Sequence, residues 1–235
     1  MKISRIIPLL IASWMPIVLC ATITPTAIYT NKDGEEVSET GEINGDAPLH
    51  VRFMSYAESL EAGSSLEWHF IHVGADGTRE ITRYEENTEF DFRESGTTTV
   101  KLLVKVGDEV VDEGTITVII SDSHLEMPNA FSPNDDGYNN IYGAKGVCNP
   151  ESTGRYRSIV EFHAYIFNRW GQKLYEWTDI SSGWDGTYNG SPVKDGVYYV
   201  LVNARGADGK VYNIRKDVNL IRNFNTVTSS TGGEE

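Results

Sequence analysis

The 235-residue sequence has only two cysteines, Cys20 and Cys148, which are too few for a small domain built on disulfides. Basic residues are also few: 20 stand against 34 acidic ones, and the formal net charge is -14. This balance disfavours nucleic acids and anionic membranes as partners, because both require clustered lysines and arginines. A hydrophobic content of 40% nevertheless excludes wholesale disorder.

The sequence also lacks the common catalytic patterns. It contains no Gly-x-Ser-x-Gly elbow, no His-Glu-x-x-His pair, no phosphate-binding loop and no cysteine cluster. The sequence does not exclude a glycosidase, because the two catalytic carboxylates of such an enzyme need no local motif. Because the rest of the chain is accounted for below without a catalytic domain, we expect a protein that is not an enzyme and needs no cofactor or metal.

Residues 1–21 differ in composition from the rest of the chain. They begin with Lys2 and Arg5, continue with a short apolar stretch that two prolines interrupt, and reach the small residue Ala21. This pattern predicts a secretory signal peptide, and the stretch is too short to span a bilayer. A buried N-terminal helix is the alternative. The predicted signal peptide implies that the protein is exported across the inner membrane.

Cys20 allows two ways of processing this segment. A lipoprotein signal has a small residue before the lipidated cysteine, whereas Leu19 stands there in this sequence. We therefore favour ordinary cleavage near Cys20 or Ala21 over lipidation of Cys20. Cleavage would leave Cys148 as the one cysteine, which we expect to be a loop residue.

Short strand-like segments separated by turn signals dominate the remainder, and no amphipathic helix of ten residues is evident. This pattern predicts antiparallel sandwiches. We expect a first domain at residues 22–121, a second at 122–222 and a flexible tail at 223–235. In the first domain the expected strands are residues 26–30, 49–55, 66–73, 88–92, 98–106 and 114–120.

Charge divides at nearly the same boundary. Residues 22–122 carry 21 acidic and seven basic side chains, whereas residues 123–235 carry 13 acidic and 11 basic ones. Almost the whole negative charge therefore belongs to the first domain. This asymmetry supports two separately built domains.

The first domain carries two apolar alternations. Leu49, Val51 and Phe53 share one strand face, and Trp68 and Phe70 share another. With the Gly-Thr-Thr-Thr-Val segment at residues 96–100, this series resembles a PKD (polycystic-kidney-disease-type) domain over roughly residues 22–120. Thr98 replaces the aromatic residue usual there. The resemblance implies a spacer or a surface interaction module.

Histidines and carboxylates in this domain do not predict a site. His69 and His72 are three residues apart in a strand, so they point to opposite faces and cannot chelate one ion together. Acidic residues are dense enough for neighbours to arise by chance, so a solvated face is expected for Glu85, Glu86, Glu89 and Glu94.

The second domain contains four specific blocks. Residues 128–137 read Pro-Asn-Ala-Phe-Ser-Pro-Asn-Asp-Asp-Gly, and residues 168–171 read Asn-Arg-Trp-Gly. Residues 183–186 read Gly-Trp-Asp-Gly, and residues 195–198 read Asp-Gly-Val-Tyr. Proline, asparagine, aspartate and glycine at these spacings predict tight turns between strands.

These blocks, in this order, resemble the gliding-motility-associated C-terminal domain, the type B C-terminal sorting domain of type IX secretion. The resemblance covers about 95 residues and implies an Ig-like β-sandwich that the outer-membrane secretion apparatus recognises as an export signal. The chain extends beyond Arg222, where the family domain usually ends, and residues 143–157 form an insertion-like loop. The motif residues that the resemblance points to are Pro128, Asn129, Phe131, Pro133, Asn134, Asp136, Gly137, Asn168, Arg169, Trp170, Gly171, Gly183, Trp184, Asp185, Gly186, Asp195, Gly196 and Tyr198.

Two further interpretations concern these blocks. Residues 134–137 share the Asp-Gly step of a calcium loop, but Gly143 stands where a bidentate glutamate is required, so side-chain-capped turns are favoured. The tryptophans of the blocks could stack on sugars, although packing in the sandwich core is favoured.

The sequence thus predicts an all-β protein of two tandem Ig-like antiparallel β-sandwich domains after a signal peptide. We expect an exported protein at the cell surface or outer membrane, or secreted, whose C-terminal domain engages the type IX secretion or gliding machinery. With so small a passenger, the chain is expected to be a component or sensor of that machinery. The alternative is a surface adhesin or a carbohydrate-binding cargo module. The expected partners are proteins of the secretion apparatus.

Overall fold

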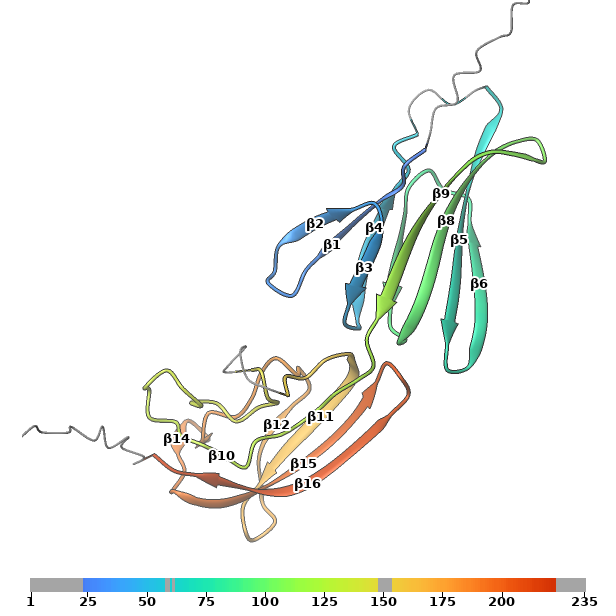
Figure 1. The fold of residues 1–235 in the computed structure, drawn as a ribbon. Coiled ribbons are helices and arrows are strands. Elements are labelled where there is room, and N and C mark those ends of the chain that lie inside the picture. The colour runs from blue at the N-terminus through green and yellow to red at the C-terminus, as the bar shows by residue number, and fades with distance from the viewer. Residues whose placement is uncertain (1–22, 58–59, 61, 148–153, 223–235) are drawn as a thin grey trace, which may run out of the picture.

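A computed structural model of the chain describes residues 23–57, 60, 62–147 and 154–222 (Figure 1). Strands and no helix make up the regular structure of these residues, so the prediction of an all-β fold is confirmed. It follows that no described helix is long and apolar enough to cross a membrane. The predicted signal peptide at residues 1–21, both cysteines and the predicted tail at 223–235 lie outside the described residues.

The N-terminal domain, residues 23–121, is a sandwich of two sheets (Figure 1). One sheet has the strand order β2-β1-β4-β7 and the other β3-β9-β8-β5-β6. Neighbouring strands are antiparallel except for β3 and β9, which are parallel. The strands are β1 (Thr26–Thr30), β2 (Glu36–Glu39), β3 (Glu42–Gly45), β4 (Leu49–Met54), β5 (Ser64–Gly74), β6 (Gly77–Arg83), β7 (Thr88–Phe92), β8 (Gly96–Val106) and β9 (Glu109–Ile120).

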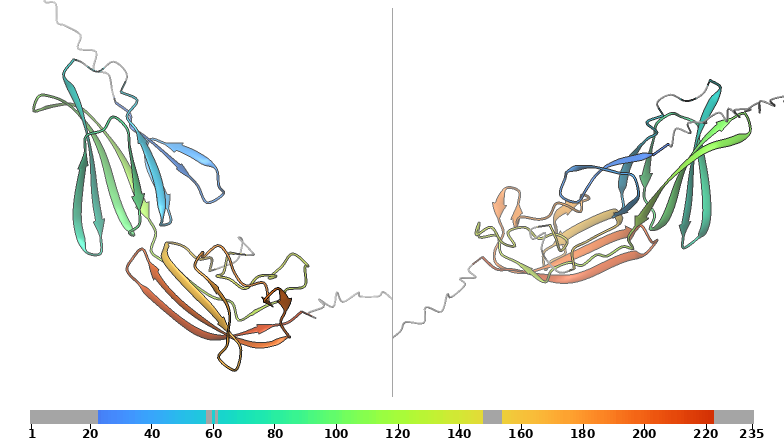
Figure 2. Two further views of the ribbon diagram at one scale, coloured as in Figure 1. Left: turned by 180° about the vertical axis from the view of Figure 1, so that it is seen from behind. Right: turned by 45° about the horizontal axis from the view of Figure 1, so that its top comes forward.

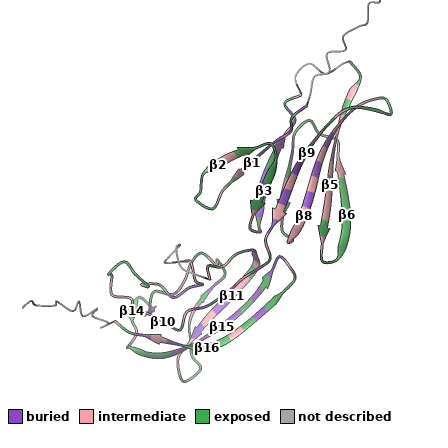
Figure 3. Cartoon of the chain, in the orientation of Figure 1, coloured by how far each residue is buried: buried purple, intermediate pink, exposed green. Residues whose placement is uncertain are grey.

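The core of this sandwich forms where the two predicted alternations meet. Val51 and Phe53 on β4 are fully buried, and Phe53 faces Trp68 and Phe70 on β5. Buried and partly exposed residues alternate along β8 in the same way (Figure 3). The Phe53 ring centre lies 5.9 Å from that of Trp68 and 5.5 Å from that of Phe70. The period-two pattern therefore places these side chains between the sheets, as predicted.

The C-terminal domain, residues 122–222, is built on one five-stranded sheet of order β10-β16-β15-β11-β12. Here β10 and β16 are parallel and the other pairs antiparallel. A separate hairpin, β13-β14, forms a second small sheet. The strands are β10 (Ala130–Phe131), β11 (Ile159–Phe167), β12 (Lys173–Trp177), β13 (Thr187–Tyr188), β14 (Ser191–Pro192), β15 (Gly196–Gly206) and β16 (Val211–Leu220).

Loops rather than strands supply most of the layer that covers this sheet. Leu125, Met127, Tyr142 and Trp184 lie in connecting segments, and all four belong to the buried core of the domain. The sheet contributes the other half of that core through alternate residues of β11 and β15, such as Ile166. The motif blocks lie largely in this loop layer, and its packing therefore positions them.

Candidate functional site

Trp184 is the centre of the motif region. Its side chain is fully buried, and its ring centre lies 5.3 Å from that of Phe131 and 5.1 Å from that of Tyr198. The Trp184 backbone exchanges two hydrogen bonds with Tyr142, and its Nε1 donates to the Thr187 carbonyl at 2.7 Å. Three of the four blocks thus converge on one aromatic cluster. For Trp184, core packing rather than sugar stacking is confirmed.

The residues on either side of Trp184 shape its loop. A Cβ atom at Gly183 would collide with the Tyr142 carbonyl, so only glycine allows this approach. Asp185 Oδ1 accepts hydrogen bonds from the Thr187 backbone at 2.9 Å and from the Thr187 hydroxyl at 2.8 Å. Gly186 follows with a positive φ of 80°. Gly183, Asp185 and Gly186 therefore hold the loop backbone in its conformation, and they do not form a site that would act on a ligand.

Asp195 opens the last block and is held by Arg222. Arg222 Nη1 lies 2.8 Å from Asp195 Oδ1, and the Arg222 backbone N–H donates to Asp195 Oδ2 at 2.8 Å. The backbone hydrogen bond from Arg222, with the adjacent guanidinium, lowers the pKa of Asp195. Sequence reasoning used Arg222 only as a domain boundary, because no local pattern links residues 195 and 222.

The opening block combines core residues with a capped loop. Phe131 is buried, and the Pro128 carbonyl accepts the Tyr142 hydroxyl at 3.1 Å. Asp136 Oδ1 then accepts the Tyr138 backbone N–H at 2.9 Å, which is the main cause of a lowered Asp136 pKa. The Asp136 carboxylate thus caps its own loop, as the interpretation of capped turns predicted.

The Asn168 block is the one that does not join the aromatic cluster. Asn168 Oδ1 accepts the backbone N–H groups of Trp170 and Gln172, both at 3.0 Å, and closes the turn between β11 and β12. Gly171 has a positive φ of 80°, which such a turn requires. Gln172 Nε2 donates to the Tyr188 hydroxyl at 3.1 Å and links this turn to the β13-β14 hairpin.

Trp170 at the tip of this turn is 76% exposed, so the expectation that the block tryptophans fill the core is wrong for this residue. The turn reverses the chain at the end of the sheet, and the side chain of its third residue points out to solvent. The Arg169 guanidinium carbon lies 4.2 Å from the Trp170 ring centre, which is a cation–π contact. Arg169 and Trp170 therefore form the exposed, chemically distinctive pair of the motif.

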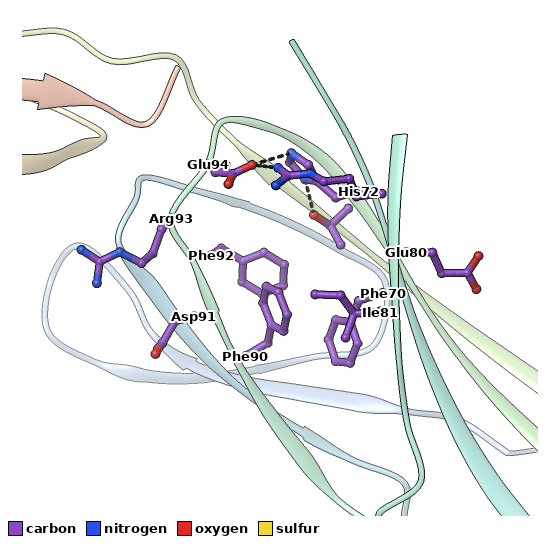
Figure 4. Close-up of a pocket in the computed structure, with 11 residues that line it drawn as sticks. Phe70, His72, Glu80, Ile81, Phe90, Asp91, Phe92, Arg93 and Glu94 are labelled. Atoms are coloured by element: carbon purple, nitrogen blue, oxygen red, sulfur yellow. Dashed lines mark hydrogen bonds and ion pairs between the residues drawn. The ribbon is translucent and has the colours of Figure 1, made fainter. Parts of the chain in front are cut away.

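The N-terminal domain offers a second candidate, a hollow of about 500 Å³ on its open side between the edge strands β6 and β7. Figure 4 shows the rings of Phe70, Phe90 and Phe92 grouped in it, with Arg93 pointing away. The Phe70 and Phe90 rings stack at 4.7 Å between centres. The hollow is thus an opening between two sheets rather than a gathering of catalytic groups.

His69 and His72 lie on opposite faces of β5, as the strand spacing predicts. His69 contacts Glu67 and Glu80, whereas His72 lines the hollow. His72 Nε2 is buried without a hydrogen bond, 3.7 Å from Glu94 Oε2, and burial lowers the pKa of His72. In the part of the chain that the structure describes, no group of three histidine, cysteine or acidic side chains is placed to hold a metal ion.

The glutamates for which a solvated face was expected have separate roles in the structure. The backbone carbonyls of Glu85 and Glu86 accept the Trp68 indole N–H, at 3.1 and 3.4 Å. The Glu94 carboxylate forms an ion pair with Arg79. Glu85, Glu86 and Glu89 are exposed, as expected for a solvated face.

Comparison with solved structures finds weak similarities. The chain resembles the FN1–FN3 domains of chicken CNTN1 (TM-score 0.28, 9% identity, covering 82% of this chain and 73% of that one). It also resembles dimeric latent PorU from Porphyromonas gingivalis (TM-score 0.25, 12% identity, covering 85% of this chain and 20% of that one). A third similar structure is a tetra-tandem repeat in the extending region of a large adhesion protein (TM-score 0.26, 12% identity, covering 85% of this chain and 67% of that one). These scores are too low to carry a functional argument. No curated protein shows significant sequence similarity to the chain.

The family comparison concerns the C-terminal domain. Residues 125–215 match the CHU_C Type IX secretion signal domain, a segment that contains the Trp184 cluster and the Asn168 turn. The resemblance predicted from the four blocks is therefore confirmed for this part of the chain, and the C-terminal domain is a type IX secretion signal domain.

Proposed function

We propose that the chain is an exported, non-enzymatic cell-surface protein that serves the type IX secretion or gliding machinery as a component or sensor. The observation that carries the proposal is the match of residues 125–215 to the secretion signal domain. Its N-terminal domain acts as a spacer or interaction module, and the density of acidic side chains there supports a protein partner rather than a nucleic acid.

Within the signal domain, the proposed contact with the secretion apparatus is the turn at residues 168–171. Phe131, Trp184 and Tyr198 of the motif are buried in the core. The exposed carboxylates of Asp136, Asp185 and Asp195 accept backbone hydrogen bonds that fix the surrounding loops. The side chains of Arg169 and Trp170 are instead exposed and contact each other. Tryptophan and arginine are among the residues that most often dominate the binding energy of protein interfaces.

Export in a bacterium with a type IX system tests this function. Deleting residues 122–235 is expected to retain the N-terminal domain in the periplasm, as measured by surface labelling and fractionation. Trp170→Ala is expected to reduce surface appearance while leaving the thermal unfolding of the purified chain unchanged. Tyr138→Ala removes another exposed aromatic side chain, 71% exposed, from the same domain and is the matched control.

The results separate two levels of the proposal. Efficient surface appearance of the chain without residues 122–235 would overturn the sorting role. Normal export of Trp170→Ala would overturn the assignment of the turn alone. A pull-down from outer membranes that recovers no protein of the secretion apparatus would count against a component or sensor role.

The alternative function, a carbohydrate-binding cargo module, requires an exposed aromatic ring that can stack on a sugar. Trp68 and Trp184 are both fully buried, so neither ring offers a face to a sugar. Trp170 remains exposed, and binding to a glycan array that Trp170→Ala abolishes would favour this alternative.

A further inference from the structure

The connection between the two domains is short, and it forms hydrogen bonds to both of them. Strand β9 ends at Ile120, and the Ser121 backbone N–H donates to the Gly45 carbonyl of the N-terminal domain at 3.0 Å. Two residues later, the Ser123 hydroxyl donates to Asp208 at 2.7 Å and lies 2.9 Å from the Tyr212 hydroxyl. The linker therefore has few residues left that could act as a hinge.

Ser158 lies where the linker meets both domains. It is 2% exposed, and its φ of 49° is a left-handed conformation that serine adopts rarely. Its hydroxyl accepts the Ala47 backbone N–H of the N-terminal domain at 3.1 Å and lies 3.0 Å from the Ser121 hydroxyl. The Ser158 carbonyl accepts the Ala207 backbone N–H at 2.9 Å. One buried serine of the C-terminal domain thus contacts the other domain, the linker and the β15-β16 turn.

The turn between β15 and β16 enters the N-terminal domain. Ala207 is 9% exposed and belongs to the core cluster of that domain, against which Val160 also packs. The Ala207 carbonyl accepts the Ser95 backbone N–H at 3.1 Å. Both views in Figure 2 show the tip of this hairpin against the end of the N-terminal sandwich. The joint therefore combines apolar burial with hydrogen bonds.

Charged groups surround this joint. Glu161 of the C-terminal domain pairs with Arg205, and that hydrogen bond lowers the pKa of Glu161, with Arg93 of the N-terminal domain adding to the effect. A crevice of about 200 Å³ between the domains is lined by Arg93, Arg205 and Asp208, among others. Opposite charges thus face each other across the rim of the joint.

We infer that the two domains form one rigid unit, locked by the buried Ser158 hydroxyl and by insertion of Ala207 into the N-terminal core. Tandem sandwiches joined by an exposed linker ordinarily move relative to each other. Here, separating the domains would leave the Ala47 N–H and the Ser158 hydroxyl without their partners and would expose apolar surface, both of which cost free energy. The N-terminal domain is therefore a fixed cap on one end of the signal domain rather than a loosely tethered passenger.

Nitrogen-15 relaxation of the purified full chain tests this inference. A rigid unit gives the backbone amides of both domains one shared rotational correlation time. Ala207→Glu places a carboxylate in the apolar contact and is expected to abolish that shared value, so that each domain gives its own, shorter time. Val211→Glu adds the same charge near the same turn at a position that is 63% exposed, and it is expected to keep the shared value.

Ser158→Gly provides a second variant that isolates the hydroxyl. Glycine accepts a φ of 49° readily, so local folding is preserved while the hydrogen bonds to Ala47 and Ser121 are lost. We expect the domains to decouple in this variant with the amide spectrum of each domain retained. Two different correlation times in the unmodified chain, or an unchanged shared time in both Ala207→Glu and Ser158→Gly, would overturn the inference.

Discussion

Arg222 Nη1 lies 2.8 Å from Asp195 Oδ1 and 2.6 Å from the Val193 carbonyl oxygen, so one guanidinium joins the end of β16 to the segment that leads into β15. A second nitrogen, Nη2, donates to the Gly186 carbonyl at 3.1 Å. The last described residue of the C-terminal domain therefore stabilises two of the four motif blocks.

Removing this guanidinium is expected to destabilise the C-terminal domain. Arg222→Ala deletes the charge-assisted pair with Asp195 and removes the donor to the partly buried Val193 carbonyl, which costs about 1–3 kcal/mol in the free energy of unfolding. Urea unfolding followed by tryptophan fluorescence measures the change. Arg215→Ala, at an exposed position on the preceding strand β16, is the control and is expected to change stability by less than about 0.5 kcal/mol.

Trp184 is expected to be the most sensitive core position of the signal domain. Trp184→Ala removes a fully buried ring that contacts Phe131 and Tyr198, and it is expected to lower the free energy of unfolding by about 3–5 kcal/mol. Trp184→Phe keeps part of the packing and should cost less. An unchanged melting temperature in Trp184→Ala would contradict the central position of this side chain.

Gly183 is expected to tolerate no side chain. Gly183→Ala forces a methyl group against the Tyr142 carbonyl and the Ile141 side chain, and overpacking of this kind costs about 1–3 kcal/mol. Differential scanning calorimetry should show a lower melting temperature for the C-terminal domain. Gly41→Ala makes the same change where no atom lies within 4 Å, and its melting temperature should be unchanged.

His72 is expected to make the stability of the N-terminal domain depend on pH. Burial lowers the pKa of His72 below its ordinary value of 6.5, and the charge of Arg79 adds to this effect. The unfolded chain therefore binds the proton more readily than the folded chain, so stability is lost as the pH falls below about 6.5 and toward the lower folded pKa.

The matched measurement compares unfolding of the original chain with that of His72→Gln between pH 8 and pH 5, a range that brackets the ordinary histidine pKa of about 6.5. Glutamine retains a polar group beside Thr98, whose hydroxyl lies 2.9 Å from His72 Nδ1, but it does not titrate. The loss of stability on acidification should be smaller in the variant. An identical pH dependence of both chains would show that His72 does not contribute.

Sequence patterns predicted the buried strands better than the exposed ones. The bounds expected for β1 and β7 agree with the structure, because apolar residues or flanking turns mark them. Strands β2 and β6 were not predicted: their residues are mostly exposed and polar, so no apolar alternation marks them. Strand β9 begins at Glu109 rather than at residue 114 because its first half is also mostly exposed.

The sequence predicted the four motif blocks, but it did not predict which of their residues are buried, which cap the backbone and which are exposed. Turn chemistry indicates where Asn168 and Asp136 cap the backbone, yet it does not tell that Trp170 points outward while Trp184 points inward. The roles of Arg222 and Ser158 depend on contacts between segments far apart in the chain. No local pattern encodes such contacts, and only the folded structure brings them together.

Because β10 pairs in parallel with β16, the sheet of the signal domain cannot form fully until the last strand of the domain has been synthesised. Ala130 and Phe131, near the beginning of the domain, pair with Asn219 and Leu220, and Arg222 then fastens the loop layer. A nascent chain released before these residues lacks the strand that joins the first part of the domain to its sheet. Premature termination before residue 219 would therefore prevent the C-terminal domain from completing its sheet.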